Sequence, residues 1–83
     1  MLRDRLIGLV TEILAKNAIE RIPAIDARLS EVGLSSMDMV NLMFAVEAAF
    51  DVELPAAEIT PENFYSIASI EALLTRLGVS AAS

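Results

Sequence analysis

Two adjacent serines are the side chains of this sequence best suited to covalent chemistry. Ser35 and Ser36 lie between the turn residues Gly33-Leu34 and an apolar run that begins at Met37. A serine at this place can cap a helix by accepting a hydrogen bond from a backbone N–H. An exposed serine can also be the point at which another enzyme attaches a group. Spacing alone leaves both roles open for the two hydroxyls.

The other residue types exclude most kinds of enzyme. The chain has no histidine and no cysteine, so the commonest general base, the thiolate nucleophile and the usual zinc ligands are missing. Glu47 and Asp51 are one helical turn apart, but they fall on an open face rather than in a cleft. We therefore expect a protein that is not an enzyme and that holds no metal ion.

The distribution of charge points to a protein partner. The net charge is −6, and the stretch from Leu29 to Thr75 holds eight acidic residues and no basic one. Phosphate contacts need clustered lysine and arginine, so we expect no binding to nucleic acid. Such a field would steer a partner with a basic docking surface, although a solvated acidic surface has the same composition.

Hydropathy argues against a membrane protein. The longest unbroken apolar run, from Leu42 to Val46, is far shorter than the roughly 20 residues that cross a bilayer. The first residues place charges inside an apolar repeat, which is not typical of a signal peptide. We expect a cytoplasmic protein with no membrane span.

Apolar residues recur at helical spacing through most of the chain, and no segment alternates as a strand does. Helices are expected at 2–17, from the serines to about Phe50, at 60–65 and from Ser66 to Leu77. The sequence therefore predicts an all-α four-helix bundle, with three longer helices and a short third helix that opens at Thr60. We expect one domain over 1–78 and a frayed tail over 79–83.

A long ordered loop should join the first two helices, because Pro23 and scattered charges break the repeat there. Its apolar residues are expected to hold it to the core; they are Ile19, Ile22, Ile25, Leu29 and Leu34.

The helix that begins at the serines carries more apolar surface than one core contact needs. Its cap is expected to combine Ser35 as N-cap with Asp38 three residues later. One face should cover the core and holds Met39, Leu42, Met43, Val46, Ala49 and Phe50. A second face holds Met37, Val40 and Phe44, flanked by Asn41, Glu47 and Asp51. This face is either a docking surface for a basic partner or the side of a helix surrounded by its neighbours.

Two segments together resemble a known family. The stretch Gly33-Leu34-Ser35-Ser36-Met37 and the ending "AVEAAFDVELP" are similar to the acyl carrier proteins and their peptidyl and aryl carrier relatives. In that family the pattern is Gly-x-Asp-Ser-Leu, followed by a helix that ends Leu-Glu-Glu-x-Phe-x-Ile-x-Ile-Pro. The resemblance covers essentially the whole chain.

The resemblance implies that Ser36 carries 4′-phosphopantetheine, attached by a phosphopantetheinyl transferase. The thiol of that group would hold acyl, aryl or aminoacyl groups as thioesters and present them to acyl-loading and acyl-transfer enzymes, as in fatty acid or polyketide biosynthesis. Met37, Val40, Asn41, Phe44, Glu47 and Asp51 would lie on the partner surface, and Leu54 near the acyl-chain entrance. We expect a monomer. The alternative is an unmodified acidic adaptor that uses the Met37/Val40/Phe44 patch.

The departures from the family pattern concern charge. Ser35 replaces the family aspartate, Asn41 replaces a common acid, and Ala48 and Ala49 stand where many fatty-acid carriers have glutamates. Partners that recognise a densely acidic helix should bind this protein less well. The departures favour a specialised free-standing carrier over the housekeeping one.

Overall fold

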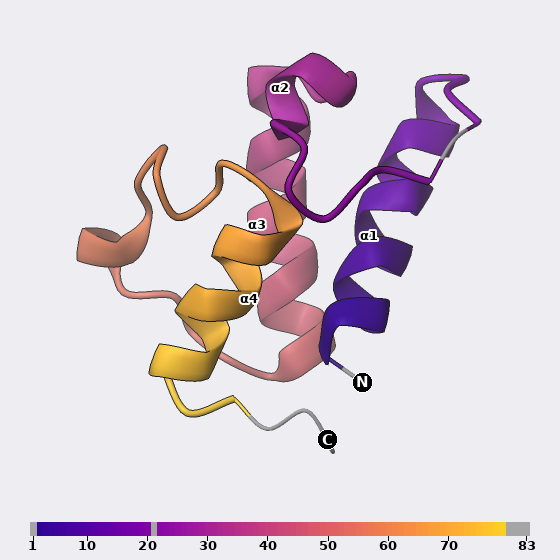
Figure 1. The fold of residues 1–83 in the computed structure, drawn as a ribbon. Helices are drawn as coiled ribbons and strands as arrows, with labels where there is room; N and C mark the ends of the chain where they lie inside the picture. The colour runs from indigo at the N-terminus through magenta and orange to yellow at the C-terminus, as the bar shows by residue number, and fades with distance from the viewer. Residues whose placement is uncertain (1, 21, 80–83) are drawn as a thin grey trace.

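The structure is a computed structural model, and it describes residues 2–20 and 22–79. Its elements are α1 (Leu2–Lys16), α2 (Leu29–Val32), α3 (Ser36–Phe50), the 3-10 turn η1 (Ala56–Glu58) and α4 (Ile67–Arg76). The described residues contain no strand, which confirms the predicted all-α four-helix bundle. In Figure 1, α1 packs against α3 and α4, and the short α2 lies over the start of α3.

The core is almost entirely aliphatic and comes mainly from the three long helices, with further residues from α2 and the connecting segments. The fully buried side chains are Leu6, Val10, Leu14, Leu29, Leu42, Val46, Ile67, Ile70, Leu73 and Leu74. Phe64 and Leu54, from the segment between α3 and α4, close the remaining side. Burial of a side chain of this size stabilises the fold by about 1.5–3 kcal/mol, so the bundle depends on the periodicity of these helices.

A hydrogen-bonded turn ends α1 and brings the next residues against the segment that precedes α3. Ala18 adopts a left-handed conformation (φ 62°). Its N–H donates to Ala15 O (3.0 Å), and the N–H of Ile19 donates to Leu14 O (2.8 Å). These two bonds form a Schellman motif with Asn17 as the C-cap residue. Ile19 then lies against Gly33, immediately before α3.

The loop after α1 differs from the prediction at two places. Leu29–Val32 form the one-turn helix α2, which is too short to show a helical period in the sequence. Ile22 was expected to hold the loop to the core, and this was wrong: it is 76% exposed. Ile19 and Ile25 do pack against the core, and Leu29 and Leu34 belong to it.

The predicted short helix at 60–65 was also wrong. Thr60 makes the expected cap, since its Oγ1 accepts from the N–H of Asn63 (3.2 Å) and its carbonyl accepts from the N–H of Phe64 (3.2 Å). The turn cannot continue because Phe64 is buried and Ser66 already caps α4. The short helical turn in this segment lies earlier, at η1.

The C-terminal end was predicted to fray from residue 79. Val79 is instead attached to the bundle, because its N–H donates to Leu74 O (2.9 Å) and its side chain packs against the core. Residues 80–83, the rest of the predicted tail, lie outside the described part of the chain. Within the described residues, no helix is both long and apolar enough to span a bilayer.

Candidate functional site

The two serines have different tasks at the start of α3. Ser35 is the N-cap residue: its Oγ accepts from the N–H of Asp38 (3.2 Å), and Asp38 Oδ2 accepts from the N–H of Ser35 (2.9 Å). This is the predicted capping box. The Ser35 hydroxyl therefore serves as the helix cap, and the Ser36 hydroxyl is the one that remains available for chemistry.

Ser36 is the first residue of α3 and is exposed. Within the described part of the chain, its hydroxyl has no hydrogen-bond partner. The backbone N–H groups at the first positions of a helix have no intrahelical acceptor, and they carry the positive end of the helix dipole. A phosphate ester on Ser36 would therefore lie where α3 favours negative charge. The site fits a phosphorylated attachment in both access and electrostatics.

Asp38 receives a second hydrogen bond from outside its own helix. Asn17 Nδ2 at the end of α1 donates to Asp38 Oδ2 (2.8 Å). The pKa of Asp38 is lowered from its ordinary value, first by the backbone N–H of Ser35 and then by the side chains of Asn17 and Ser35. These donors stabilise the carboxylate form, so Asp38 is an anion at neutral pH.

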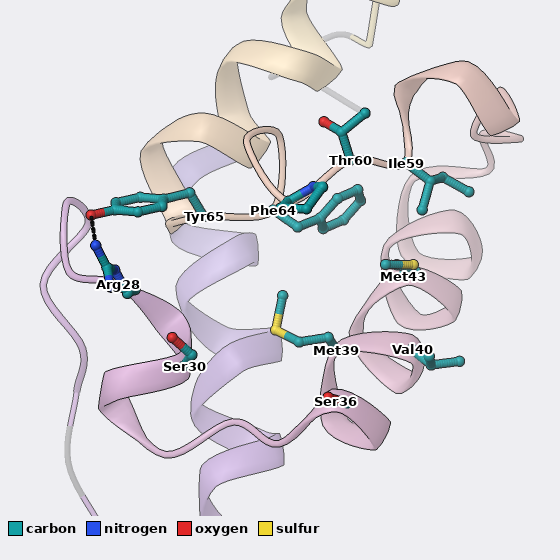
Figure 2. Close-up of a pocket in the computed structure, with 11 residues that line it drawn as sticks. Arg28, Ser30, Ser36, Met39, Val40, Met43, Ile59, Thr60, Phe64 and Tyr65 are labelled. Carbon is teal, nitrogen blue, oxygen red and sulfur yellow. Dashed lines mark hydrogen bonds between the residues drawn. The ribbon is translucent and has the colours of Figure 1, made fainter.

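A groove of about 560 Å³ opens beside Ser36. Ser36 lies at one edge, and Arg28 and Tyr65 lie across the groove from it (Figure 2). Arg28 Nη2 donates to the Tyr65 hydroxyl (3.2 Å), and its guanidinium stacks over the Tyr65 ring at 5.0 Å. Between these edges the lining is mainly apolar, with Met39, Val40, Met43, Ile59, Pro61 and Phe64. The groove has room for a chain attached at Ser36.

The second apolar face of α3 is open to solvent. Met37 is 70% exposed, Phe44 is 64% exposed and Val40 is 41% exposed. Asn41 is exposed beside them. The core-facing stripe is also as expected, with Leu42, Val46 and Phe50 buried and Met39, Met43 and Ala49 packed against the core. Of the two interpretations left by the sequence, the surrounded helix is therefore excluded.

Two acids that flank this face have structural contacts as well. Glu47 Oε2 accepts from the N–H of Leu54 (2.9 Å), which fastens the segment after α3 back onto the helix. Asp51 is the C-cap of α3 in a left-handed conformation, with its N–H donating to Glu47 O. Leu54 itself is only 6% exposed. It belongs to the core and lies apart from the exposed face of α3.

Three residues at the site were not singled out by the sequence. Asn17 contacts Asp38 across 21 positions of the chain, and Arg28 meets Tyr65 across 37. No periodic pattern links residues so far apart, and only the arrangement of the loops brings them together.

Residues 4–77 match the family of the phosphopantetheine attachment site. Aminoacyl carrier protein 1 of Bradyrhizobium diazoefficiens is 51% identical over 72 residues, which cover 87% of this chain and 80% of that protein. The carrier chain in a crystal structure of Bradyrhizobium japonicum glycine:[carrier protein] ligase complexed with glycylated carrier protein is 51% identical. It superposes with a TM-score of 0.76 over 88% of this chain and 99% of that one.

A more distant likeness agrees on the fold. An acyl carrier protein from Pseudomonas fluorescens, at 23% identity, superposes with a TM-score of 0.77 over 98% of this chain and 74% of that one. The exposed serine at the start of α3, the groove beside it and these matches lead to one assignment. The chain belongs to the acyl carrier protein family, and its cofactor is covalently attached 4′-phosphopantetheine.

Proposed function

We propose that this protein is an aminoacyl carrier protein, in which Ser36 bears the phosphopantetheine arm and an amino acid is carried on it as a thioester. The observation that carries the attachment site is the exposed hydroxyl of Ser36, which has no hydrogen-bond partner among residues 2–20 and 22–79, beside a Ser35 hydroxyl that caps the helix. The aminoacyl class is supported by the relatives, which are named aminoacyl carrier proteins.

Attachment needs little from the chain beyond access. Ser36 Oγ attacks the pantetheine-bearing phosphorus of coenzyme A. The Oγ–P bond forms as the bond to adenosine 3′,5′-bisphosphate breaks, and the hydroxyl proton passes to a base of the transferase. The N-terminal N–H groups of α3 then favour the phosphodiester by about 0.3–1 kcal/mol. The arm supplies the thiol that the sequence lacks.

The open face of α3 would serve the partner enzymes. Met37, Val40 and Phe44 offer an apolar contact next to Ser36, and Asn41, Glu47 and Asp51 rim it. A ligase or transferase with a basic docking surface complements this rim. The carrier itself catalyses no reaction. It works as a monomer in the cytoplasm, where coenzyme A and ATP are supplied to its partners.

The attachment site is tested by mass spectrometry after incubation with coenzyme A and a phosphopantetheinyl transferase of broad specificity. Wild type should gain one phosphopantetheine mass. Ser36→Ala should gain none, whereas Ser35→Ala should still be modified, although loss of its cap costs about 0.5–2 kcal/mol. Wild type that stays unmodified with several transferases would contradict the proposal and favour the unmodified adaptor.

The cargo is tested separately on the modified protein. The Bradyrhizobium japonicum glycine:[carrier protein] ligase is the probe, because a similar chain is held in its crystal complex. With ATP and glycine, holo wild type should gain one glycyl mass that hydroxylamine removes, as expected for a thioester. A holo protein that accepts only fatty acyl groups from acyl-loading enzymes, and no amino acid from such ligases, would refute the aminoacyl assignment.

A further inference from the structure

The start of α3 is held by a residue from another helix. Asn17 is the C-cap of α1, and its Nδ2 lies 2.8 Å from Asp38 Oδ2. The same carboxylate oxygen accepts from the N–H of Ser35 at 2.9 Å. One oxygen thus joins the C-terminal end of α1 to the N-cap of α3, and Ser36 lies between the two cap residues.

A second contact joins the same two segments. Gly33 has φ 133°, and a Cβ added there would collide with Cδ1 of Ile19 and lie 3.5 Å from Cδ2 of Leu14. The turn before α3 is therefore packed closely onto the end of α1. An apolar contact and the Asn17–Asp38 hydrogen bond therefore both join the end of α1 to the segment that leads into α3.

Ser36 has no anchor of its own. Its hydroxyl has no hydrogen-bond partner among the described residues, so its placement depends on the backbone that Ser35 and Asp38 hold. Asn17 is exposed and outside the apolar stripe of α1. Its removal should release this local geometry while the core, built by other residues, remains intact.

We propose that Asn17 is a positioning residue for Ser36. It holds the Asp38 carboxylate, and through it the first turn of α3, so that the Ser36 hydroxyl is presented to incoming enzymes in one orientation. The proposal rests on Ser36 being the attachment site. A cap with no such role would affect the stability of α1 but not the rate at which Ser36 reacts.

The test measures the kinetics of modification by one transferase with coenzyme A. Asn17→Ala should lower kcat by about two- to tenfold, the range that corresponds to one net hydrogen bond. KM should stay within about twofold, because the docking face on α3 is unchanged. Glu20→Gln, on the exposed loop just beyond, is the matched control and should behave as wild type.

Exchanging the asparagine and the aspartate between positions 17 and 38 separates a positioning role from general destabilisation. Asn17→Asp places two carboxylates in contact and should lower kcat further than Asn17→Ala. In the double variant Asn17→Asp with Asp38→Asn, the amide at position 38 can donate to the carboxylate at position 17. The kcat of the double variant should therefore recover toward that of the single variant Asp38→Asn. Amide exchange at residues 36–38 should rise in Asn17→Asp and fall again in the double variant.

The outcomes are distinct from those for the attachment site itself. Unmodified wild type would remove the basis of both proposals. Modified wild type together with an unchanged kcat for Asn17→Ala, or no recovery in the double variant, would overturn the positioning role alone. The positioning role would also be overturned if, across the Asn17 variants, kcat fell only in proportion to the loss of thermal stability.

Discussion

Truncation of Phe44 tests whether one face of α3 packs on the core while the other is open to solvent. Phe44 is 64% exposed, whereas Leu42, two positions earlier on the same helix, is fully buried. Truncating a buried phenylalanine to alanine costs about 3–5 kcal/mol. About a third of the Phe44 surface is covered, and no closed cavity would remain, so Phe44→Ala should cost about 1 kcal/mol or less.

Leu42→Ala is the matched control, because it makes the same kind of change in the core. It should cost about 2–5 kcal/mol. In a domain of this size, 1 kcal/mol corresponds to a thermal midpoint shift of about 4–8 °C. Phe44→Ala should therefore melt within about 8 °C of wild type, and Leu42→Ala well below that.

Urea titration followed by circular dichroism measures both free energies, and aminoacyl loading of the holo proteins measures the effect on partners. Phe44→Ala should reduce loading at subsaturating carrier concentration, because an apolar side chain exposed beside the attachment site is then missing from the interface. A loss of 3 kcal/mol or more in Phe44→Ala would show that the side chain is part of the core. Full stability with unchanged loading would show that this face does not contact the ligase.

Two further predictions concern the junction that holds the site. Gly33→Ala should lower the free energy of unfolding by about 1–2 kcal/mol, because φ 133° is a conformation that L residues rarely adopt, and the end of the Ile19 side chain would also have to move. Gly78→Ala, with φ 85° but open space around it, should lose less, and equal losses in urea titration would argue against the close contact. Asp38 has a lowered pKa, so its stabilisation is present above the ordinary value of 3.8 and is lost as pH falls through the lower folded value. Between pH 5 and pH 3 the urea midpoint should fall more in wild type than in Asp38→Asn, and an equal fall would contradict the assigned cause.

The long helices could be predicted because several local signals agree. In α3 the apolar spacing, the Ser35–Asp38 cap and the later Pro55 all indicate the same element. The same agreement holds for α4, which begins after Ser66 with a second capping box. At 60–65 there were signals for the start of a helix but no apolar repeat after them, and the prediction failed. Thr60 caps a single turn, and the burial of Phe64 prevents that turn from extending.

The candidate site divides in the same way. The two faces of α3 follow from helical geometry, and the exposure of Met37 and Phe44 agrees with it. Ile22 was misplaced because its burial depends on how an irregular segment folds back, which spacing does not encode. The Asn17–Asp38 contact was missed for the same reason, since it requires both the left-handed turn at Ala18 and the close approach at Gly33.

The open apolar face of α3 also affects how the molecule behaves among its own copies. At neutral pH a net charge of −6 makes the chains repel one another. Near the isoelectric point, about 4.3, that mutual repulsion disappears while Met37 and Phe44 stay uncovered. Mild acid therefore favours self-association through this face, and concentrated stocks are best kept well above that pH.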